Sequence, residues 1–185
     1  MENKIIIGLV GTLASGKGAV KEYLINNHEA KGCKFSDIFR DVLNRLNIPI
    51  TRDNLQKVST SLRVNFGEDL LSKTIIGDVG KIDSKIVIVD GIRRFTDMNN
   101  LKNLSNFFIL AVDADFKLRY ERMKARNENE GDSSKIYEDF LKDENAEADR
   151  QIPEVIKTAD FLIENNGTLE ELHRQTDKII EKINK

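Results

Sequence analysis

The N-terminal segment "IIIGLVGTLASGKGAV" constrains the fold of this chain more than any other. Residues 5–10 form a continuous, β-branched apolar run, which is typical of a buried strand. The residues that follow have the spacing of a phosphate-binding loop, namely Gly11, four residues, Gly16 and then Lys17. A helical pattern over Lys17–Asn27 comes next, so the segment predicts a strand, a phosphate loop and a helix in succession. The alternative is a glycine turn that only resembles such a loop.

A phosphate loop binds phosphates through backbone N–H groups, and its lysine reaches the β- and γ-phosphates. We therefore expect ATP phosphates to contact the loop at Gly11, Ala14, Ser15, Gly16, Lys17, Gly18 and Ala19. The Ser or Thr that normally ligates magnesium after the lysine is absent, because positions 18 and 19 are Gly and Ala. Direct magnesium ligation by this loop is not expected, so the ion must be held elsewhere.

Further apolar runs predict the rest of the sheet. Residues 85–90 and 107–112 are predicted as buried strands, and residues 33–35 and 161–164 as weaker ones. Helical patterns lie between them, at 36–46, 51–66 and 168–183, the last with Thr168 and Glu171 as a capping box. Strands separated by helices predict an α/β fold with a five-stranded, parallel sheet in a single domain, 1–185. Residues 47–80 and 126–150 look like poor core material and are predicted to be excursions from that sheet.

Composition excludes several classes of protein. The 29 Lys and Arg against 31 Asp and Glu give a net charge of −2, so no basic field attracts nucleic acid or a membrane surface. A single cysteine, Cys33, excludes an internal disulfide and a cysteine-based zinc site. The N-terminal apolar run is too short to span a membrane and lacks a signal-peptide cleavage pattern. We expect a cytoplasmic protein.

Two polar segments follow predicted strands. In "VIVDGIRR", Asp90 ends a buried strand and so lies at the carboxyl edge of the sheet, where open α/β folds bind ligands. A carboxylate there orients Mg²⁺ through water, although a plain turn cap is the alternative. In "FSDIFRDVL", Asp37 and Arg40 follow a weaker strand, and helix N-capping is the alternative for Asp37.

These motifs resemble those of the nucleoside monophosphate kinases. A glycine directly after the loop lysine occurs in that group, although its usual Thr is replaced by Ala19. "DGIRR" resembles the D-G-F-P-R motif of adenylate kinases, which implies that Arg93 or Arg94 binds the acceptor phosphate, and the choice stays open. "FSDIFR" resembles their T-G-D-M-L-R segment, which implies acceptor contacts from Asp37 and Arg40.

Arginines also recur in "RYERMKAR", where Arg119, Arg122 and Arg126 share one helix face. A solvated charged face is the alternative, but the resemblance implies that Arg122 and Arg126 clamp the transferring phosphoryl group, with residues 126–150 as a lid. "ADFLIENNGTLEEL" resembles the closing segment of dephospho-coenzyme A kinases. That likeness implies a position beside the adenine for Asn165, Asn166 and Gly167.

The resemblance covers nearly the whole chain and is strongest to a largely archaeal family of kinase-like P-loop proteins. "NLQKVSTSLRVNFGEDLL" matches its acceptor-side insertion, within 47–80, and Arg63 there is a further candidate for the acceptor phosphate, with a helix-surface arginine as the alternative. The implied fold is the three-layer α/β/α fold of P-loop NTPases. The implied activity is transfer of the γ-phosphoryl group of ATP, with Mg²⁺, to a nucleoside or deoxynucleoside monophosphate.

Two other functions remain open from the residues alone. Transfer to an acceptor phosphate needs no general base, because that oxygen is already ionised. Transfer to a hydroxyl, as in dephospho-coenzyme A, requires a carboxylate base, for which Asp37 is the candidate. A nucleotide-binding regulator or weak ATPase without an acceptor is the third possibility, and Gly18 and Ala19 are the residues that favour it.

Overall fold

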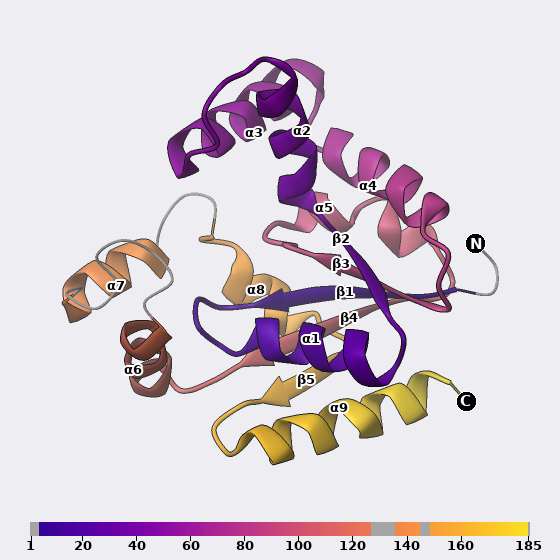
Figure 1. The fold of residues 1–185 in the computed structure, drawn as a ribbon, viewed down its shortest axis with the longest axis vertical. Coiled ribbons are helices and arrows are strands. Elements are labelled where there is room, and N and C mark those ends of the chain that lie inside the picture. The colour runs from indigo at the N-terminus through magenta and orange to yellow at the C-terminus, as the bar shows by residue number, and fades with distance from the viewer. Residues whose placement is uncertain (1–3, 127–135, 145–148, 185) are drawn as a thin grey trace.

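A computed structural model of the chain describes residues 4–126, 136–144 and 149–184. Its centre is a parallel sheet of five strands in the order β2-β3-β1-β4-β5 (Figure 1). The strands are β1 Ile5–Gly11, β2 Lys31–Lys34, β3 Ile86–Asp90, β4 Phe107–Asp113 and β5 Phe161–Glu164. The predicted five-stranded parallel sheet is confirmed. Because the strands are parallel, the loops after β1, β3 and β4 all leave the same edge.

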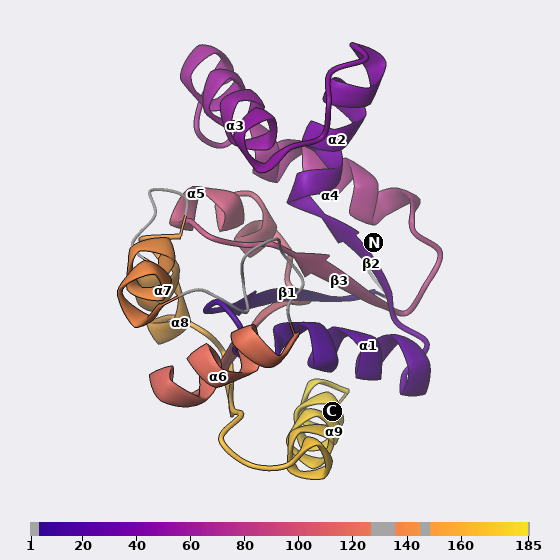
Figure 2. The same ribbon diagram turned by 60° about the vertical axis from the view of Figure 1, so that its left-hand side comes forward.

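Helices occupy both faces of the sheet, which makes three layers (Figures 1 and 2). They are α1 Lys17–Asn27, α2 Phe35–Arg45, α3 Arg52–Phe66, α4 Leu70–Lys81, α5 Phe95–Met98, a 3-10 turn Leu101–Asn103, α6 Phe116–Arg126, α7 Tyr137–Glu144, α8 Ile152–Lys157 and α9 Leu169–Ile183. Among the described residues, no helix is both long and apolar enough to cross a membrane.

The alternating side chains of β1 supply both halves of the core. Ile7 and Leu9 pack with Val20 of α1 and Leu172 of α9. Their neighbours on the opposite face pack against α2, α4, α5 and α8. Complete burial of each such aliphatic side chain stabilises the fold by about 1.5–3 kcal/mol. The central strand is therefore apolar along its whole length, which is why it could be identified from sequence.

Several predicted boundaries are wrong for identifiable reasons. Residue 35 does not continue β2 but opens α2, since the Phe35 ring is 4% exposed and packs into the core. Helix α3 begins one residue late because the Thr51 hydroxyl caps it, accepting a hydrogen bond from the Asn54 N–H at 3.2 Å. The capping box at the start of α9 is confirmed, with Thr168 and Glu171 as its two members.

The two excursions contribute more to the core than their composition predicts. Leu71, Ile75 and Val79 of α4 are fully buried against the sheet, so the description of 47–80 as poor core material is wrong for this helix. Phe140 of α7 is fully buried as well, and its ring lies 5.1 Å from that of Phe116 of α6. Part of the 126–150 segment, residues 127–135 and 145–148, lies outside the described residues.

Candidate active site

The loop between β1 and α1 has a backbone that only small residues allow. Gly16 has a φ of 97°, and a Cβ there would lie 2.1 Å from Nδ2 of Asn165. A Cβ on Gly11 would lie 2.6 Å from the Val112 carbonyl oxygen and 2.7 Å from Oγ of Ser15. Both glycines are therefore required by close approach, and Gly16 also by its left-handed backbone. The buried Ser15 hydroxyl has no hydrogen-bond partner among the described residues.

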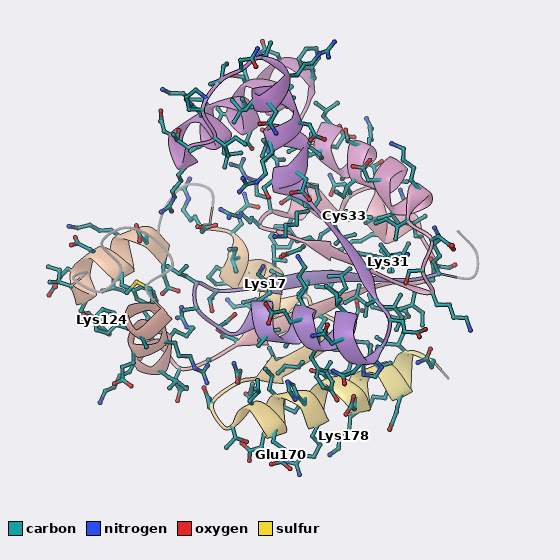
Figure 3. The ribbon with its side chains drawn as sticks, in the orientation of Figure 1. Lys17, Lys31, Cys33, Lys124, Glu170 and Lys178 are labelled. Carbon is teal, nitrogen blue, oxygen red and sulfur yellow. The ribbon has the colours of Figure 1, made fainter. Side chains whose placement is uncertain are left out.

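Lys17 and Asp90 meet at the carboxyl edge of the sheet. The Lys17 ammonium, at the N-terminal end of α1 (Figure 3), contacts Oδ1 of Asp90 at the end of β3. Burial raises the pKa of the Asp90 carboxyl, but the neighbouring lysine ammoniums outweigh burial and hold that pKa below its usual range. Asp90 is therefore ionised at neutral pH and is a carboxylate of the kind that orients magnesium through water.

A second lysine reaches the same carboxylate. Nζ of Lys21 lies 3.2 Å from Oδ2 of Asp90, so one aspartate holds two ammonium groups. Burial lowers the pKa of Lys21 and Asp90 opposes that effect. Lys21 was not predicted from the sequence to belong to the site. Its signal is its place four residues after Lys17, which puts both side chains on one face of α1.

Asp113 was also missed, although it ends β4 as Asp90 ends β3. The Thr12 hydroxyl of the loop donates to Oδ1 of Asp113 at 2.8 Å. The backbone N–H of Asn165 donates to the carbonyl oxygen of Asp113, also at 2.8 Å. The carboxyl end of β4 is thus tied to the loop and to the turn after β5. The strand-end pattern that singled out Asp90 would have found it.

The predicted adenine-proximal residues are engaged in building this turn. Nδ2 of Asn165 donates to the Ser15 carbonyl oxygen at 2.8 Å, and the side chain is 6% exposed. Asn166 accepts a hydrogen bond from the Asp115 N–H at 2.8 Å. A Cβ on Gly167 would lie 1.7 Å from Oε2 of Glu171. Asn165 therefore holds the phosphate loop against β5, and contact of the three residues with adenine stays a prediction.

The arginines of α6 do not form one solvated face. Arg119 is 6% exposed and donates to the carbonyl oxygens of Ala114, at 2.8 Å, and Leu13, at 3.2 Å. It also pairs with Glu144 of α7, so it links the phosphate loop to that helix. The charged-face alternative is wrong for Arg119, whose burial gave no signal in the sequence.

Arg122 and Arg126 are the two arginines predicted to clamp the phosphoryl group, and the structure describes the side chain of Arg122 alone. Nη1 of Arg122 donates to the Asn165 carbonyl oxygen at 2.8 Å, which places it beside the turn after β5. Arg126 ends α6, and its side chain lies outside the described residues. Their action on a phosphoryl group stays a prediction.

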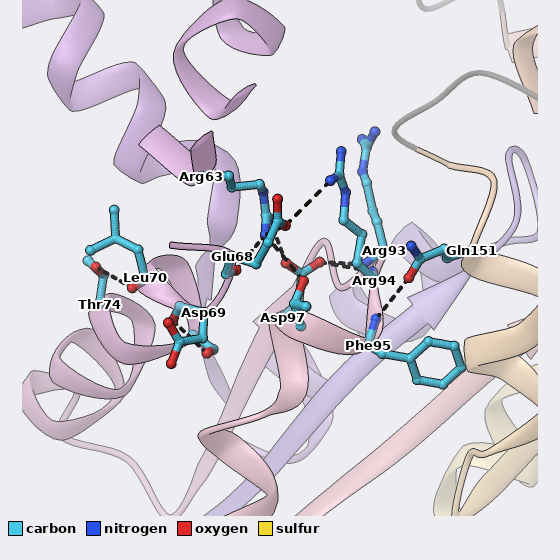
Figure 4. Close-up of polar contacts among 12 residues, drawn as sticks. Arg63, Glu68, Asp69, Leu70, Thr74, Arg93, Arg94, Phe95, Asp97 and Gln151 are labelled. Atoms are coloured by element: carbon cyan, nitrogen blue, oxygen red, sulfur yellow. Dashed lines mark hydrogen bonds and ion pairs between the residues drawn. The ribbon is translucent and has the colours of Figure 1, made fainter. Parts of the chain in front are cut away.

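The acceptor-side arginines converge on Asp97 (Figure 4). Oδ1 of Asp97 accepts from Nη2 of Arg63 at 2.6 Å, and Oδ2 accepts from the backbone N–H groups of Arg93 and Arg94 at 2.9 and 3.0 Å. Arg63 is 6% exposed, so the helix-surface alternative is wrong. Asp97, the third residue after Arg94, was not predicted from the sequence. Its carboxylate fixes the backbone of the "GIRR" turn.

Both arginine side chains of that turn face protein carboxylates. Nη1 of Arg93 lies 2.7 Å from Oδ1 of Asp149, and Nη1 of Arg94 lies 3.7 Å from Oε2 of Glu68. Asp37 and Arg40 are exposed on α2. The capping alternative for Asp37 is wrong, because Lys34 is the N-cap residue and no side chain in the described part of the chain caps this helix.

The residues present fit a nucleotide with its own magnesium ion. The glycine cradle is intact, and among the described residues a Cβ at Gly18 would meet nothing within 4 Å. Within residues 4–126, 136–144 and 149–184, no group of three His, Cys, Asp or Glu could hold a metal ion alone. Asp90, acting through water, is the residue that would orient the ion, and the ion would neutralise phosphate charge.

Comparison with known proteins gives a consistent result. A sequence model of the AAA domain matches residues 7–150. The UPF0200 protein of Pyrococcus horikoshii is 30% identical over 184 residues, which is 97% of each chain. That of Staphylothermus marinus is 33% identical over 147 residues, covering 80% of this chain and 76% of its own.

Solved structures agree on the fold. TT1252 from Thermus thermophilus has a TM-score of 0.61 at 20% identity, covering 97% of this chain and 98% of its own. Shikimate kinase from Bacteroides thetaiotaomicron has a TM-score of 0.62 at 11% identity, covering 98% and 99%. The predicted three-layer, P-loop kinase-like fold is confirmed.

Proposed function

The chain belongs to the UPF0200 family and matches the AAA domain model over residues 7–150, and we propose that it transfers the γ-phosphoryl group of ATP to a nucleoside or deoxynucleoside monophosphate. The observation that carries this proposal is the contact between the loop lysine, Lys17, and the strand-end carboxylate, Asp90. The two groups come from different elements and meet at the edge where parallel α/β sheets bind ligands.

ATP binding exchanges the partner of Lys17. Backbone N–H groups of the glycine loop bind the β- and γ-phosphates, and Lys17 turns from Asp90 to the phosphate oxygens. Lys21 stays on Oδ2 of Asp90 and keeps that carboxylate in place. Asp90 would orient, through water, a magnesium ion bound to the nucleotide, and that ion would supply neutralisation of the phosphate charge.

The acceptor monophosphate binds across the site from the loop. Arg93, Arg94 and Arg40 are the cations that hold its phosphate, with Asp97 fixing the turn of the first two. The attacking oxygen is already ionised, so catalysis consists of in-line positioning and charge neutralisation. Arg122 and Arg126 of α6 stabilise the charge that develops on the transferred group.

The test measures coupled ADP release from ATP and magnesium over a panel of acceptors. The panel contains the common nucleoside and deoxynucleoside monophosphates, dephospho-coenzyme A, shikimate and no acceptor. We expect strong stimulation by one monophosphate, abolished by Lys17→Ala and retained by Lys178→Ala, which removes an exposed lysine of α9. Slow release that no acceptor stimulates would favour the alternative, a nucleotide-binding regulator or weak ATPase. Ala19→Thr is then the first change to make.

One observation favours hydroxyl phosphorylation as a second candidate. Within the described part of the chain, the exposed Asp37 carboxylate makes no hydrogen bond or ion pair, whereas Asp90 is held by two lysines. Asp37 is therefore the carboxylate able to act as a base toward an acceptor hydroxyl. Asp37→Asn should leave transfer to a monophosphate largely intact and abolish transfer to a hydroxyl. Equal losses with both acceptors would refute this distinction.

A further inference from the structure

The junction between α3 and α4 holds a carboxylate between two arginines. Oε2 of Glu68 lies 3.7 Å from Nη1 of Arg63 and 3.7 Å from Nη1 of Arg94 (Figure 4). Gly67 turns the chain with a φ of 100°, and the Glu68 carbonyl oxygen then accepts a hydrogen bond from Arg63 at 3.0 Å. The backbone of Glu68 is thus fixed firmly, whereas its carboxylate is held at ion-pair distance only.

The three charged groups differ in their contact with water. The Glu68 side chain is 54% exposed, whereas those of Arg63 and Arg94 are 6% and 17% exposed. An exposed carboxylate gains little from such a pair and can rotate into water at small cost. Arg63 keeps a counter-ion when the Glu68 carboxylate rotates away, because Asp97 remains buried against it at 2.6 Å. The carboxylate is therefore the replaceable member of the cluster.

We propose that Glu68 is a placeholder for the acceptor's anionic group, and that its displacement selects a phosphate over a carboxylate. The identity of the acceptor rests on the proposed function, whereas the anion site itself does not. A carboxylate ligand would exchange one monoanion for another beside Arg94 and gain no charge. A phosphate dianion brings a second negative charge and a third oxygen to the two guanidinium groups. Glu68 thus sets a minimum charge for ligands of this site.

The opposite role for Glu68 makes the opposite prediction. If its carboxylate served only to orient the Arg94 side chain, removing the charge would weaken anion binding. If it is a placeholder, removing the charge strengthens anion binding because a competitor is lost. Glu68→Gln keeps the size of the side chain and separates the two roles by the sign of the effect.

The experiment measures binding of inorganic phosphate by calorimetric titration, with no nucleotide present. All variants carry Lys17→Ala, which weakens phosphate binding at the glycine loop, so the remaining site dominates the titration. We expect Glu68→Gln to tighten phosphate binding about three- to fivefold, the upper part of the range for an exposed ion pair. Acetate as the probe should gain more than phosphate, because the selection against singly charged ligands is lost with the Glu68 charge. The matched control is Asp69→Asn, which removes the same charge from a residue paired with Lys73 at 2.8 Å, and it should leave phosphate binding unchanged.

The outcomes separate this inference from the phosphotransferase proposal, since no step requires turnover. Unchanged or weaker phosphate binding in Glu68→Gln would overturn it. An equal gain in Asp69→Asn would also overturn it, because the effect would then come from net charge. The gain must disappear when Arg94→Met is added, and a gain that survives that change assigns the anion to another site. Unaltered thermal melting of Glu68→Gln is expected from its exposure and checks the fold.

Discussion

Removing the Asp97 carboxylate is expected to destabilise the fold strongly. The side chain is 2% exposed and accepts three hydrogen bonds, one from Arg63 and two from the backbone N–H groups of Arg93 and Arg94. Among the described residues, Asp97→Ala would leave the buried Arg63 guanidinium with the loosely held Glu68 carboxylate, at 3.7 Å, as its one remaining counter-ion. Breaking a buried ion pair from one side costs about 3–5 kcal/mol.

Asp97→Ala also leaves the backbone N–H groups of Arg93 and Arg94 without their acceptor, but this loss adds little to the destabilisation. Arg93 is exposed at this turn, so water replaces Asp97 at its N–H group. Arg94 is more enclosed, and an unsatisfied buried donor costs about 1–3 kcal/mol. The Glu68 carbonyl oxygen still accepts from Arg63 and offsets part of the loss. We therefore expect the free energy of unfolding to fall by about 4 kcal/mol.

Urea denaturation followed by circular dichroism measures this change. With a slope of about 2 kcal/mol per molar urea, the midpoint should fall by about 2 M. Asp53→Ala is the control, because its pair with Lys57 is 70% exposed on both sides and contributes at most about 1 kcal/mol. Arg63→Met and the variant with both changes complete a double-mutant cycle. The double variant should lose less unfolding free energy than the sum of the losses in Asp97→Ala and Arg63→Met.

If Asp97→Ala lowered the free energy of unfolding by less than about 1 kcal/mol, the reasoning would be refuted, because the buried Arg63 charge left without Asp97 should cost more than that. Strict additivity in the cycle would refute it as well, since it would mean that Arg63 and Asp97 do not interact. An intermediate loss for Asp97→Asn is expected, because the amide keeps an acceptor but removes the charge.

Three further predictions concern the loop and its surroundings. Gly11→Ala should weaken binding of a fluorescent ATP analogue at least tenfold, because the added Cβ would lie 2.6 Å from a backbone oxygen, and unchanged affinity would contradict the loop geometry. In the folded protein the pKa of Asp90 lies below its ordinary value of 3.8, so the stabilising effect of its ionised form is present above pH 3.8 and is lost as pH falls through the lower, folded-state pKa. The difference in unfolding free energy between the wild type and Asp90→Asn, measured by urea denaturation, should therefore become smaller below pH 3.8. A difference that does not change with pH would contradict this role of Asp90. Burial raises the pKa of Cys33 to about 11, so at pH 8 its thiol should react with an aromatic disulfide reagent roughly a thousandfold slower than a full thiolate and accelerate tenfold per pH unit.

The sheet could be predicted because parallel strands are buried on both faces and so are apolar along their length. Thr168 and Glu171 could be predicted for a similar reason, since a capping box is encoded within four residues. Arg63 could not, because its burial depends on Asp97, which lies 34 positions away on another helix. Arg119 could not either, since its partner Glu144 belongs to α7. Local periodicity describes which face a residue occupies but not what packs over that face.

Three of the cations predicted to bind phosphate share one feature that sequence did not reveal. Lys17 contacts Asp90, Arg93 lies 2.7 Å from Asp149, and Arg94 lies 3.7 Å from Glu68. On the proposed function, a phosphate therefore replaces a protein carboxylate at each of these positions instead of meeting a bare cation. Such an exchange gains charge only when the ligand is more negative than the group it displaces. Affinity for singly charged anions should then be low at these three positions, and selection for phosphates there follows from the resident carboxylates as much as from the cations.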